Sequence, residues 1–385
     1  MELTILMPCL NELETIGTCI RKAKRSIKAF NLDAEILISD NGSTDESILI
    51  AESMGARVVI TEEKGYGSAL RYGIANARGK FVIMADADDS YNFEDIYPFV
   101  VKLREGYDLV MGNRFNGGIE KNAMPLLHRY LGNPVLSFLG RLFFRLPIRD
   151  FHCGFRGFNT QAMKAIDFTT TGMEFASEMI IKSSFRKLRI AEIPVKLYPD
   201  GRTRAPHLRT WRDGWRHLRF LLLYSHNWLF LYPGLALIIG GLGIVGALLP
   251  APITIGKVTF DIHTMLYAAF FVLTGMQMLT FYYCSQLFAS HMGLVKKPSW
   301  LPAFNRFFTL ERGLIIGVTL FLTGIILTLC SFQIWTHKSF GNLQPSSMLR
   351  IIIPSIMTLI LGTQVILSSF FASILDIWKN KHTED

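Results

Sequence analysis

Phe81-Val82-Ile83-Met84-Ala85-Asp86-Ala87-Asp88-Asp89 is the stretch that decides the fold of this chain. Its five apolar residues have the length of a buried strand, and its acidic residues would stand where that strand ends. Carboxylates at such an edge supply hard oxygen ligands, which suit Mg²⁺ or Mn²⁺ held on a diphosphate. An acidic turn is the simpler interpretation, because a single D-x-D tripeptide often arises by chance.

Segments of strand length and helix length alternate around this stretch. The predicted strands cover residues 3–8, 35–39, 57–60, 81–85 and 108–112, and the predicted helices cover 12–30, 45–54 and 66–77. This order is typical of an α/β domain whose mainly parallel sheet has helices on both faces. Ligands of such sheets bind at the carboxyl ends of the strands. We therefore expect the polar residues after the strands to form one site.

Polar residues also follow the first two predicted strands. Asn11 and Glu12 come after the first, and the run Asp40-Asn41-Gly42-Ser43-Thr44-Asp45 comes after the second. Part of that run has a local explanation, since Asn41-Gly42 fits a turn and Ser43 or Thr44 fits a helix cap. Asp40 is then the residue that needs a functional role.

Gly65-Tyr66-Gly67 resembles part of a dinucleotide-binding fingerprint. The third glycine is missing, and the pair follows the third predicted strand instead of the first. A Rossmann dehydrogenase is therefore disfavoured. We expect these glycines to form a tight turn that lets the backbone approach a nucleotide.

Five motifs, taken together, resemble the family 2 glycosyltransferases of the GT-A fold. They are Pro8-x-x-Asn11-Glu12, Asp40-Asn41-Gly42-Ser43-x-Asp45, Gly65-x-Gly67-x-Ala69, Asp86-x-Asp88 and Gly112-Asn113-Arg114. Within that family the chain is most similar to the polyprenyl-phosphate hexose synthases, the dolichol-phosphate-mannose and bactoprenol-glucosyl transferase type. The resemblance covers residues 1 to about 220.

The resemblance implies a nucleotide-sugar donor site and a metal site. Asp88 would be the principal metal ligand with Asp86 beside it, and Asp86, Asp88 and Asp89 would form the catalytic group. The family commonly has Leu-Gln where this chain has Asp89-Ser90, which leaves open whether Asp89 or Ser90 takes the place of that glutamine. The implied donor-binding residues are Pro8, Asn11, Glu12, Asp40, Gly42, Ser43, Lys64, Gly65 and Asp86.

A lipid phosphate would need cations more than it needs a catalytic base. Its second pKa is about 6, so it is already an anion near neutral pH. The resemblance places Arg114 and Arg129 on the acceptor phosphate. Arg156 is as readily a structural residue, and Arg202 and Arg204 could instead neutralise a departing diphosphate or touch lipid head groups. The predicted acceptor set is Arg114, Arg129, Arg156, Arg202 and Arg204.

Two segments are amphipathic and basic. Residues 124–146 could pack on the sheet or lie on a membrane surface, and the pattern leaves both open. In residues 207–226, Trp211 and Trp215 share one helical face while arginines take other faces, which favours a helix in the membrane interface. We therefore predict a catalytic domain over 1–206 and an interfacial helix over 207–226.

The rest of the chain has the composition of a membrane domain. Half of the 385 residues are hydrophobic, mean hydropathy is +0.29, and the excess lies after residue 226. Nucleic acid would explain the net charge of +9 but not this apolar part. Four predicted spans, each longer than the roughly 20 residues that cross a bilayer, cover about 228–249, 263–287, 313–335 and 351–375 of the domain 227–385.

The basic residues of the loops predict the orientation. The loop 290–312 holds four lysines and arginines, against one in 250–262 and two in 336–350, so it should be cytoplasmic together with both termini and the catalytic domain. The five cysteines are scattered and lack metal-ligand spacing. We expect an integral protein of a bacterial plasma membrane, whether single or a homo-oligomer.

The leading hypothesis is an inverting hexosyltransferase. It would move a hexose from UDP-glucose or GDP-mannose to polyprenyl phosphate, with Mg²⁺ or Mn²⁺ on the diphosphate. A processive polysaccharide synthase is the alternative enzyme, weakened because no Gln-x-x-Arg-Trp motif precedes the spans. A non-catalytic flippase or scaffold is disfavoured by the intact D-x-D.

Overall fold

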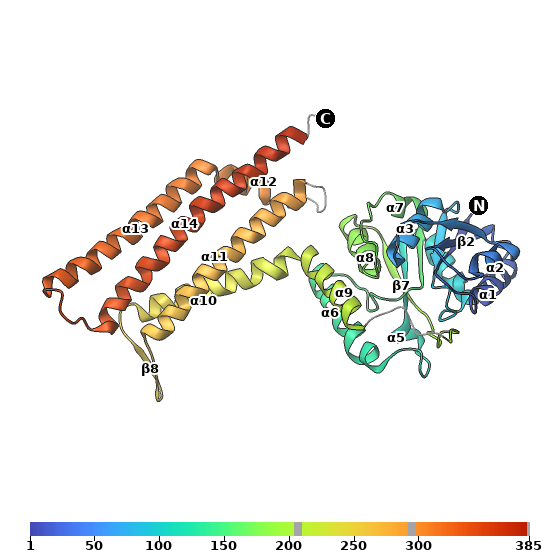
Figure 1. Ribbon diagram of the computed structural model, residues 1–385, viewed down its shortest axis with the longest axis horizontal. Coiled ribbons are helices and arrows are strands. Elements are labelled where there is room, and N and C mark those ends of the chain that lie inside the picture. Colours follow the sequence, from blue (N-terminus) through green and yellow to red (C-terminus); the bar gives the residue numbers. More distant parts are fainter. Residues whose placement is uncertain (204–209, 292–297, 383–385) are drawn as a thin grey trace. The chain divides into compact units, whose positions relative to one another are not determined.

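The computed structural model describes residues 1–203, 210–291 and 298–382. It divides into two compact units, Met1–Tyr224 and Ser225–Asp385, which are described separately (Figure 1). The basic helix α9, Thr210–Tyr224, therefore belongs to the first unit.

A sheet of seven strands forms the centre of the first unit, in the order β3-β2-β1-β4-β6-β5-β7. Among the described strands of this sheet, β6 runs antiparallel to β4 and β5, and the other pairings are parallel. The mostly parallel GT-A type of sheet is confirmed, although the sequence pattern does not predict β6 and β7. The bounds are β1 Leu3–Cys9, β2 Ala34–Asp40, β3 Arg57–Ile60, β4 Phe81–Met84, β5 Leu109–Asn113, β6 Arg156–Asn159 and β7 Ile190–Pro194.

Helices cover both faces of this sheet. One apolar core holds side chains of α1, α2 and α4, and a second core holds side chains of α3, α7 and α8. β1 lies between them and is buried at every position, as expected for a central parallel strand. The bounds are α1 Ile16–Ala29, α2 Ser47–Ser53, α3 Tyr66–Asn76, η1 Phe93–Ile96, α4 Tyr97–Arg104, α5 Arg114–Gly117, α7 Thr160–Lys164 and α8 Phe175–Phe185.

The middle of the amphipathic segment 124–146 packs on helices, while its ends, Met124 and Leu146, pack in the two cores against the sheet. It forms η2, His128–Gly132, and α6, Asn133–Phe144. Leu136 and Leu139 pack in a third core with side chains of α8 and α9. The other side of the segment is open, with Leu126 73% exposed and Tyr130 70% exposed. We call this surface the α6 apolar patch; it consists of Leu126, Tyr130, Leu131, Val135 and Phe138.

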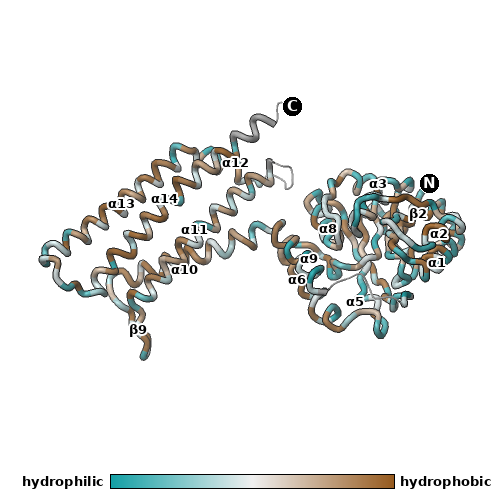
Figure 2. The backbone as a smooth tube through the Cα atoms, in the orientation of Figure 1, coloured by the Kyte–Doolittle hydropathy of each residue, from teal (hydrophilic) through white to brown (hydrophobic). Residues whose placement is uncertain are grey.

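The second unit is built of long apolar helices, drawn mostly in brown in Figure 2. Among the residues that the structure describes, four segments are long and apolar enough to cross a membrane: 227–248, 262–290, 310–337 and 345–376. Each contains most of one predicted span. The bounds are η3 Asn227–Leu231, α10 Tyr232–Leu248, β8 Ile253–Ile255, β9 Val258–Phe260, α11 Ile262–His291, α12 Leu301–Phe307, α13 Leu310–His337 and α14 Pro345–His382.

Glycines bring pairs of these helices into backbone contact. A Cβ on Gly362 of α14 would lie 2.6 Å from the carbonyl oxygen of Gly317 on α13, and a Cβ on Gly275 of α11 would lie 2.7 Å from that of Gly234 on α10. Small residues are the usual means by which membrane helices approach closely. We call these two contacts the glycine seams.

Candidate active site

Acidic side chains gather where β1 and β4 end. Asp88 is only 8% exposed and Glu12 only 6%. The Oδ1 of Asp88 accepts hydrogen bonds from the backbone N–H of Ser90 at 3.1 Å and from its hydroxyl at 2.6 Å. Ser90, rather than Asp89, is thus the residue after the D-x-D that orients the Asp88 carboxylate.

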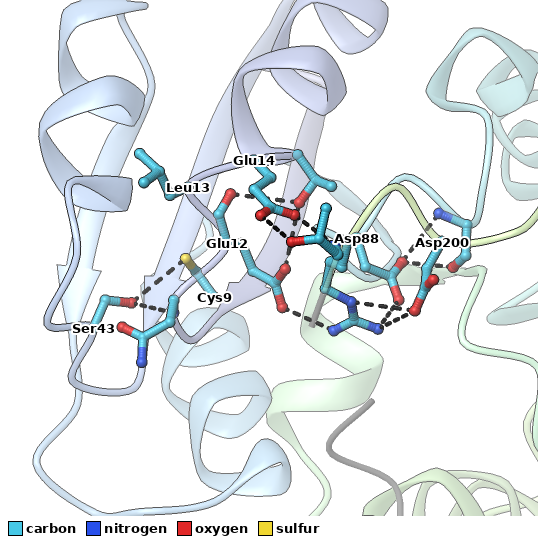
Figure 3. A network of polar contacts seen from close by, with 12 residues as sticks. Cys9, Glu12, Leu13, Glu14, Ser43, Asp88 and Asp200 are labelled. Carbon is cyan, nitrogen blue, oxygen red and sulfur yellow. Dashed lines mark hydrogen bonds and ion pairs between the residues drawn. The ribbon is translucent and has the colours of Figure 1, made fainter. Parts of the chain in front are cut away.

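Arg202 connects these carboxylates. Its Nη2 donates to Asp88 Oδ2 at 2.7 Å, and its Nη1 donates to Glu12 Oε1 at 3.1 Å. Nη2 also donates to Asp200 Oδ2 at 3.0 Å, and these contacts are part of the larger network drawn in Figure 3, where Glu12, Asp88 and Asp200 are labelled. Arg202 was predicted as an acceptor-phosphate residue; in the structure its partners are carboxylates of the predicted donor and metal site.

Asp86 stands beside this network and is only partly exposed. The pKa of its carboxyl is raised to about 7, mainly by loss of solvent and also by the negative charge of Asp88. A hydrogen bond from Tyr66 and the charge of Arg202 partly oppose this shift. A Cβ on Gly154 would lie 2.8 Å from Asp86 Oδ2. The loop at Gly154 can therefore pass this carboxylate only because it has no side chain there.

Asp89 contacts helix α1 from the turn after β4. Its backbone φ is +61°, in the left-handed region, and its Oδ1 accepts from Lys22 Nζ on α1 at 2.7 Å. Aspartate tolerates that backbone conformation better than most residues. Asp89 thus joins the turn after β4 to α1, and its predicted catalytic role stays a prediction.

The carboxylate of Asp40 accepts hydrogen bonds from its own loop. It is fully buried, and its Oδ1 accepts from the backbone N–H groups of Gly42 at 2.7 Å and Ser43 at 2.8 Å. The Ser43 hydroxyl donates to Oδ2. Both oxygens of Asp40 thus hold this turn together, with Gly42 at a φ of +91°. A carboxylate can accept further hydrogen bonds, so the donor-binding role of Asp40 stays a prediction.

The loops after β1 and β2 are joined to each other. The Ser43 hydroxyl accepts from the backbone N–H of Asn11 at 2.9 Å, and Asn11 Oδ1 accepts from the backbone N–H of Thr44 at 2.7 Å. Pro8 is buried within β1, opposite Ser39 of β2. Asn11 and Ser43 thus set the relative position of the two loops.

Asn41 joins the second loop to the loop before α3. Its Oδ1 accepts from the backbone N–H of Gly65 at 2.6 Å, and Lys64 Nζ donates to its carbonyl oxygen at 3.2 Å. Gly65 has a φ of +131°, and a Cβ on it would lie 2.1 Å from the carbonyl oxygen of Thr171. The same carbonyl oxygen accepts a hydrogen bond from the backbone N–H of Gly67 at 2.9 Å. These glycines admit the backbone of Thr171, and the approach of this turn to a nucleotide stays a prediction.

The predicted acceptor arginines have distinct surroundings. Arg114 Nε and Nη2 donate to the two oxygens of Asp150, each at 2.7 Å, and both residues are buried. Burial opposes the charge of Arg114, but Asp150 holds the pKa of its guanidinium well above the ordinary value. Arg129 is half-buried, with its guanidinium 5.6 Å from the ring centre of Tyr130 in the α6 apolar patch. Arg204 lies outside the described residues.

Arg156 is a structural residue, which corrects its assignment to the acceptor phosphate. It is fully buried, and its guanidinium donates to the carbonyl oxygens of Cys153 at 2.8 Å, Ala176 at 2.7 Å and Phe151 at 3.1 Å. A guanidinium so enclosed by backbone carbonyls cannot reach a lipid phosphate. It ties the loop before β6 to α8.

Sequence reasoning missed three acidic residues of this region. Asp150 neutralises Arg114, Asp200 contacts Arg202, and Glu14 accepts from the backbone N–H and hydroxyl of Thr203 at 2.7 and 2.6 Å. Asp150 lies 36 positions from Arg114 and Glu14 lies 189 positions from Thr203, so no spacing marks either pair, whereas Asp200 lies two positions from Arg202. In the sequence, Glu14 could have been noticed because it lies two residues after Glu12, a predicted donor-binding residue.

The acidic residues fit a divalent cation that shares its coordination with a substrate. Within the described ranges, no group of three or more His, Cys, Asp and Glu side chains could hold a metal by itself. Mg²⁺, however, is commonly held by one or two carboxylates together with substrate phosphates. The raised pKa of Asp86 beside Asp88 indicates crowded negative charge that such a cation would relieve.

Comparison with known proteins places this site in a family. Residues 4–167 match glycosyl transferase family 2, and residues 283–376 match the glycosyltransferase family 2 C-terminal transmembrane region. The low-salt glycan biosynthesis hexosyltransferase Agl6 of Haloferax volcanii is 33% identical over 97% of this chain and 89% of its own length. The dolichyl-phosphate hexose transferase of the same organism is 31% identical over 50% of this chain and 82% of its own length.

A solved structure is similar over the catalytic part. Glucosyl-3-phosphoglycerate synthase from Mycobacterium tuberculosis, in complex with Mn²⁺, UDP and glucosyl-3-phosphoglycerate, is 22% identical over 58% of this chain and 78% of that chain, with a TM-score of 0.43. The similarity of Agl6 over nearly the whole length is what decides the assignment. The predicted resemblance is confirmed: this chain belongs to glycosyl transferase family 2 and is an integral membrane glycosyltransferase.

Proposed function

We propose that the protein transfers a hexose from a nucleotide sugar to polyprenyl phosphate, with inversion at the sugar carbon. The observation that carries this proposal is the group Glu12, Asp86 and Asp88 at the carboxyl edge of the sheet, in a chain with four candidate membrane spans. Such an edge is where α/β sheets bind nucleotides. A lipid-linked acceptor explains why the same chain carries spans.

The donor half of the reaction would take place at the carboxylates. Asp88 and Asp86 are the residues that would hold Mg²⁺ or Mn²⁺, which neutralises the charge developing on a departing diphosphate. Ser90 holds the Asp88 carboxylate in position through two hydrogen bonds. The joined loops at Asn11, Ser43 and Asn41 would form the wall beside the nucleotide.

The acceptor half would be formed by Arg129 and the α6 apolar patch. A phosphate anion attacks the sugar carbon directly, so the protein has to orient it and does not have to remove a proton. Arg129 lies next to Tyr130 of the patch, where a guanidinium could hold a lipid phosphate while exposed apolar side chains contact the lipid chain. Arg114 could add its third nitrogen, because Asp150 occupies only Nε and Nη2.

Two relatives support a lipid-linked acceptor. One is named a hexosyltransferase of glycan biosynthesis and another a dolichyl-phosphate hexose transferase. We place the catalytic unit and both termini in the cytoplasm, where nucleotide sugars are made, because the loop 290–312 is the most basic of the loops between spans.

The test is product formation by the full chain in detergent. Radiolabelled UDP-glucose or GDP-mannose is mixed with polyprenyl phosphate and Mn²⁺, and label is measured in the organic phase. We expect a glycolipid with one of the two donors, which Asp88→Asn abolishes. Asp33→Asn is the matched control, since the Asp33 side chain is 72% exposed and pairs with the N-terminal amine. Polymeric product or no transfer with either donor would overturn the proposal.

A further inference from the structure

Arg202 occupies the position that a cation at Asp88 would need. Both oxygens of Asp88 are engaged: Oδ1 by Ser90 and Oδ2 by the Arg202 guanidinium at 2.7 Å. The same guanidinium reaches Glu12, and its side chain is 11% exposed. A divalent cation that binds Asp88 Oδ2 must therefore displace Arg202 or lie against another positive charge.

A folded loop keeps Arg202 in this position. The backbone N–H of Tyr198 donates to the Ser90 carbonyl oxygen at 3.0 Å, and that of Gly201 donates to the Asp88 carbonyl oxygen at 2.9 Å. After Arg202, Thr203 donates its N–H and its hydroxyl to the Glu14 carboxylate. The loop is thus attached to the turn after β4 on one side of Arg202 and to Glu14 on the other.

We propose that Arg202 holds the cation position at Asp88 in the free enzyme and excludes a metal that arrives alone. Nucleotide diphosphate offers the guanidinium several anionic oxygens in a geometry that suits its planar fork. Arg202 then leaves Asp88 for the diphosphate, and the cation takes Asp88 Oδ2. This inference rests on the metal-dependent transfer proposed above, and it makes Glu14 a positioning residue that acts through the loop.

The experiment measures Mn²⁺ binding to the full chain in detergent, from the electron paramagnetic resonance signal of free Mn²⁺. Without nucleotide, the wild type should bind weakly, and Arg202→Gln should bind at least ~10-fold more tightly, the factor that corresponds to losing one charge-assisted contact. UDP or GDP should tighten binding to the wild type and have much less effect on the variant. Arg25→Gln is the control, since Arg25 forms an exposed pair with Glu94 at 3.3 Å.

The Glu14→Gln variant distinguishes the effect on Mn²⁺ binding of moving the loop from the effect of removing a charge. Removing a negative charge near the site should weaken Mn²⁺ binding by electrostatics alone. Release of the Thr203 contacts should instead tighten it, and we expect about threefold tighter binding. This variant also decides the question if Arg202→Gln fails to fold.

The outcomes distinguish the inference from the proposed function. Nucleotide-free wild type that binds Mn²⁺ as tightly as Arg202→Gln, or a Glu14→Gln variant that binds it more weakly than wild type, overturns the role of Arg202. Wild type that binds no Mn²⁺ even with either nucleotide overturns the metal dependence of the proposed function instead.

Discussion

Breaking the buried pair of Arg114 and Asp150 should destabilise the catalytic unit strongly. The guanidinium and the carboxylate share two bonds of 2.7 Å, Asp150 also accepts from the Arg114 backbone N–H at 3.1 Å, and neither side chain is more than 9% exposed. Removing one partner leaves the other charge buried and uncompensated, which costs about 3–5 kcal/mol. Asp150→Asn or Arg114→Gln should therefore lower the unfolding temperature of this unit by on the order of 10 °C.

The double variant Arg114→Gln with Asp150→Asn removes both charges and should recover more than half of that loss. The assay is thermal unfolding of the full chain in detergent, followed by acceptor kinetics of the variants that remain folded. Arg104→Gln is the control: its pair with Glu2 is also bidentate, at 2.7 and 2.8 Å, but exposed. Its loss should cost no more than about 1 kcal/mol.

The reasoning fails if either single variant unfolds at the wild-type temperature, or if the double variant is as unstable as the two singles added together. The stable double variant then isolates the role of Arg114 in function. A raised KM for polyprenyl phosphate would support a phosphate contact by its third nitrogen. An unchanged KM would make Arg114 a structural residue only.

Three further predictions concern separate parts of the unit. Asp88→Asn should lower turnover at least ~10²-fold without unfolding the protein; near wild-type rates in saturating Mn²⁺ would contradict its assignment. Arg129→Gln should raise the KM for polyprenyl phosphate ~10-fold or more. Its nucleotide affinity, measured by calorimetric titration, should stay unchanged; loss of nucleotide binding would show that Arg129 belongs to the donor half of the site and not to the acceptor half. Burial lowers the pKa of His217 to about 4 from 6.5. As the pH drops, the unfolded state therefore binds the proton before the folded state does. The free energy of unfolding should fall between about pH 6.5 and about pH 4, by on the order of 3 kcal/mol. His217→Gln should remove that part of the slope in unfolding temperature against pH, and an unchanged slope would assign it to other groups.

The parts of the fold that the sequence predicts are those that depend on local pattern. β1 and β4 are apolar runs that end in polar residues, so both their existence and the location of the site at their carboxyl ends can be read directly. β6 cannot, because Arg156-Gly157-Phe158-Asn159 has neither alternation nor an apolar run. Its position between β4 and β5 is decided by tertiary pairing.

The roles of charged residues depended on partners that the sequence does not bring together. Arg202 lies 114 positions from Asp88, and Lys22 lies 67 positions from Asp89. Residue type and distance from the D-x-D placed Arg202 near this site, but they did not show its contacts with Asp88 and Glu12. Asp40 is the opposite case, since its partners are its own neighbours Gly42 and Ser43. A turn of that kind gives a carboxylate local hydrogen-bond partners, and the donor-binding role of Asp40 stays a prediction.

The glycine seams of the second unit have a consequence for how it can move. Where the backbones of Gly317 and Gly362 touch, α13 and α14 cannot slide along each other by less than a full helical turn without driving a larger side chain into the contact. The same holds for α10 and α11 at Gly234 and Gly275. Any rearrangement of this unit during a catalytic cycle would therefore move each pair as one rigid body, and bending would be concentrated in the segments that join the pairs.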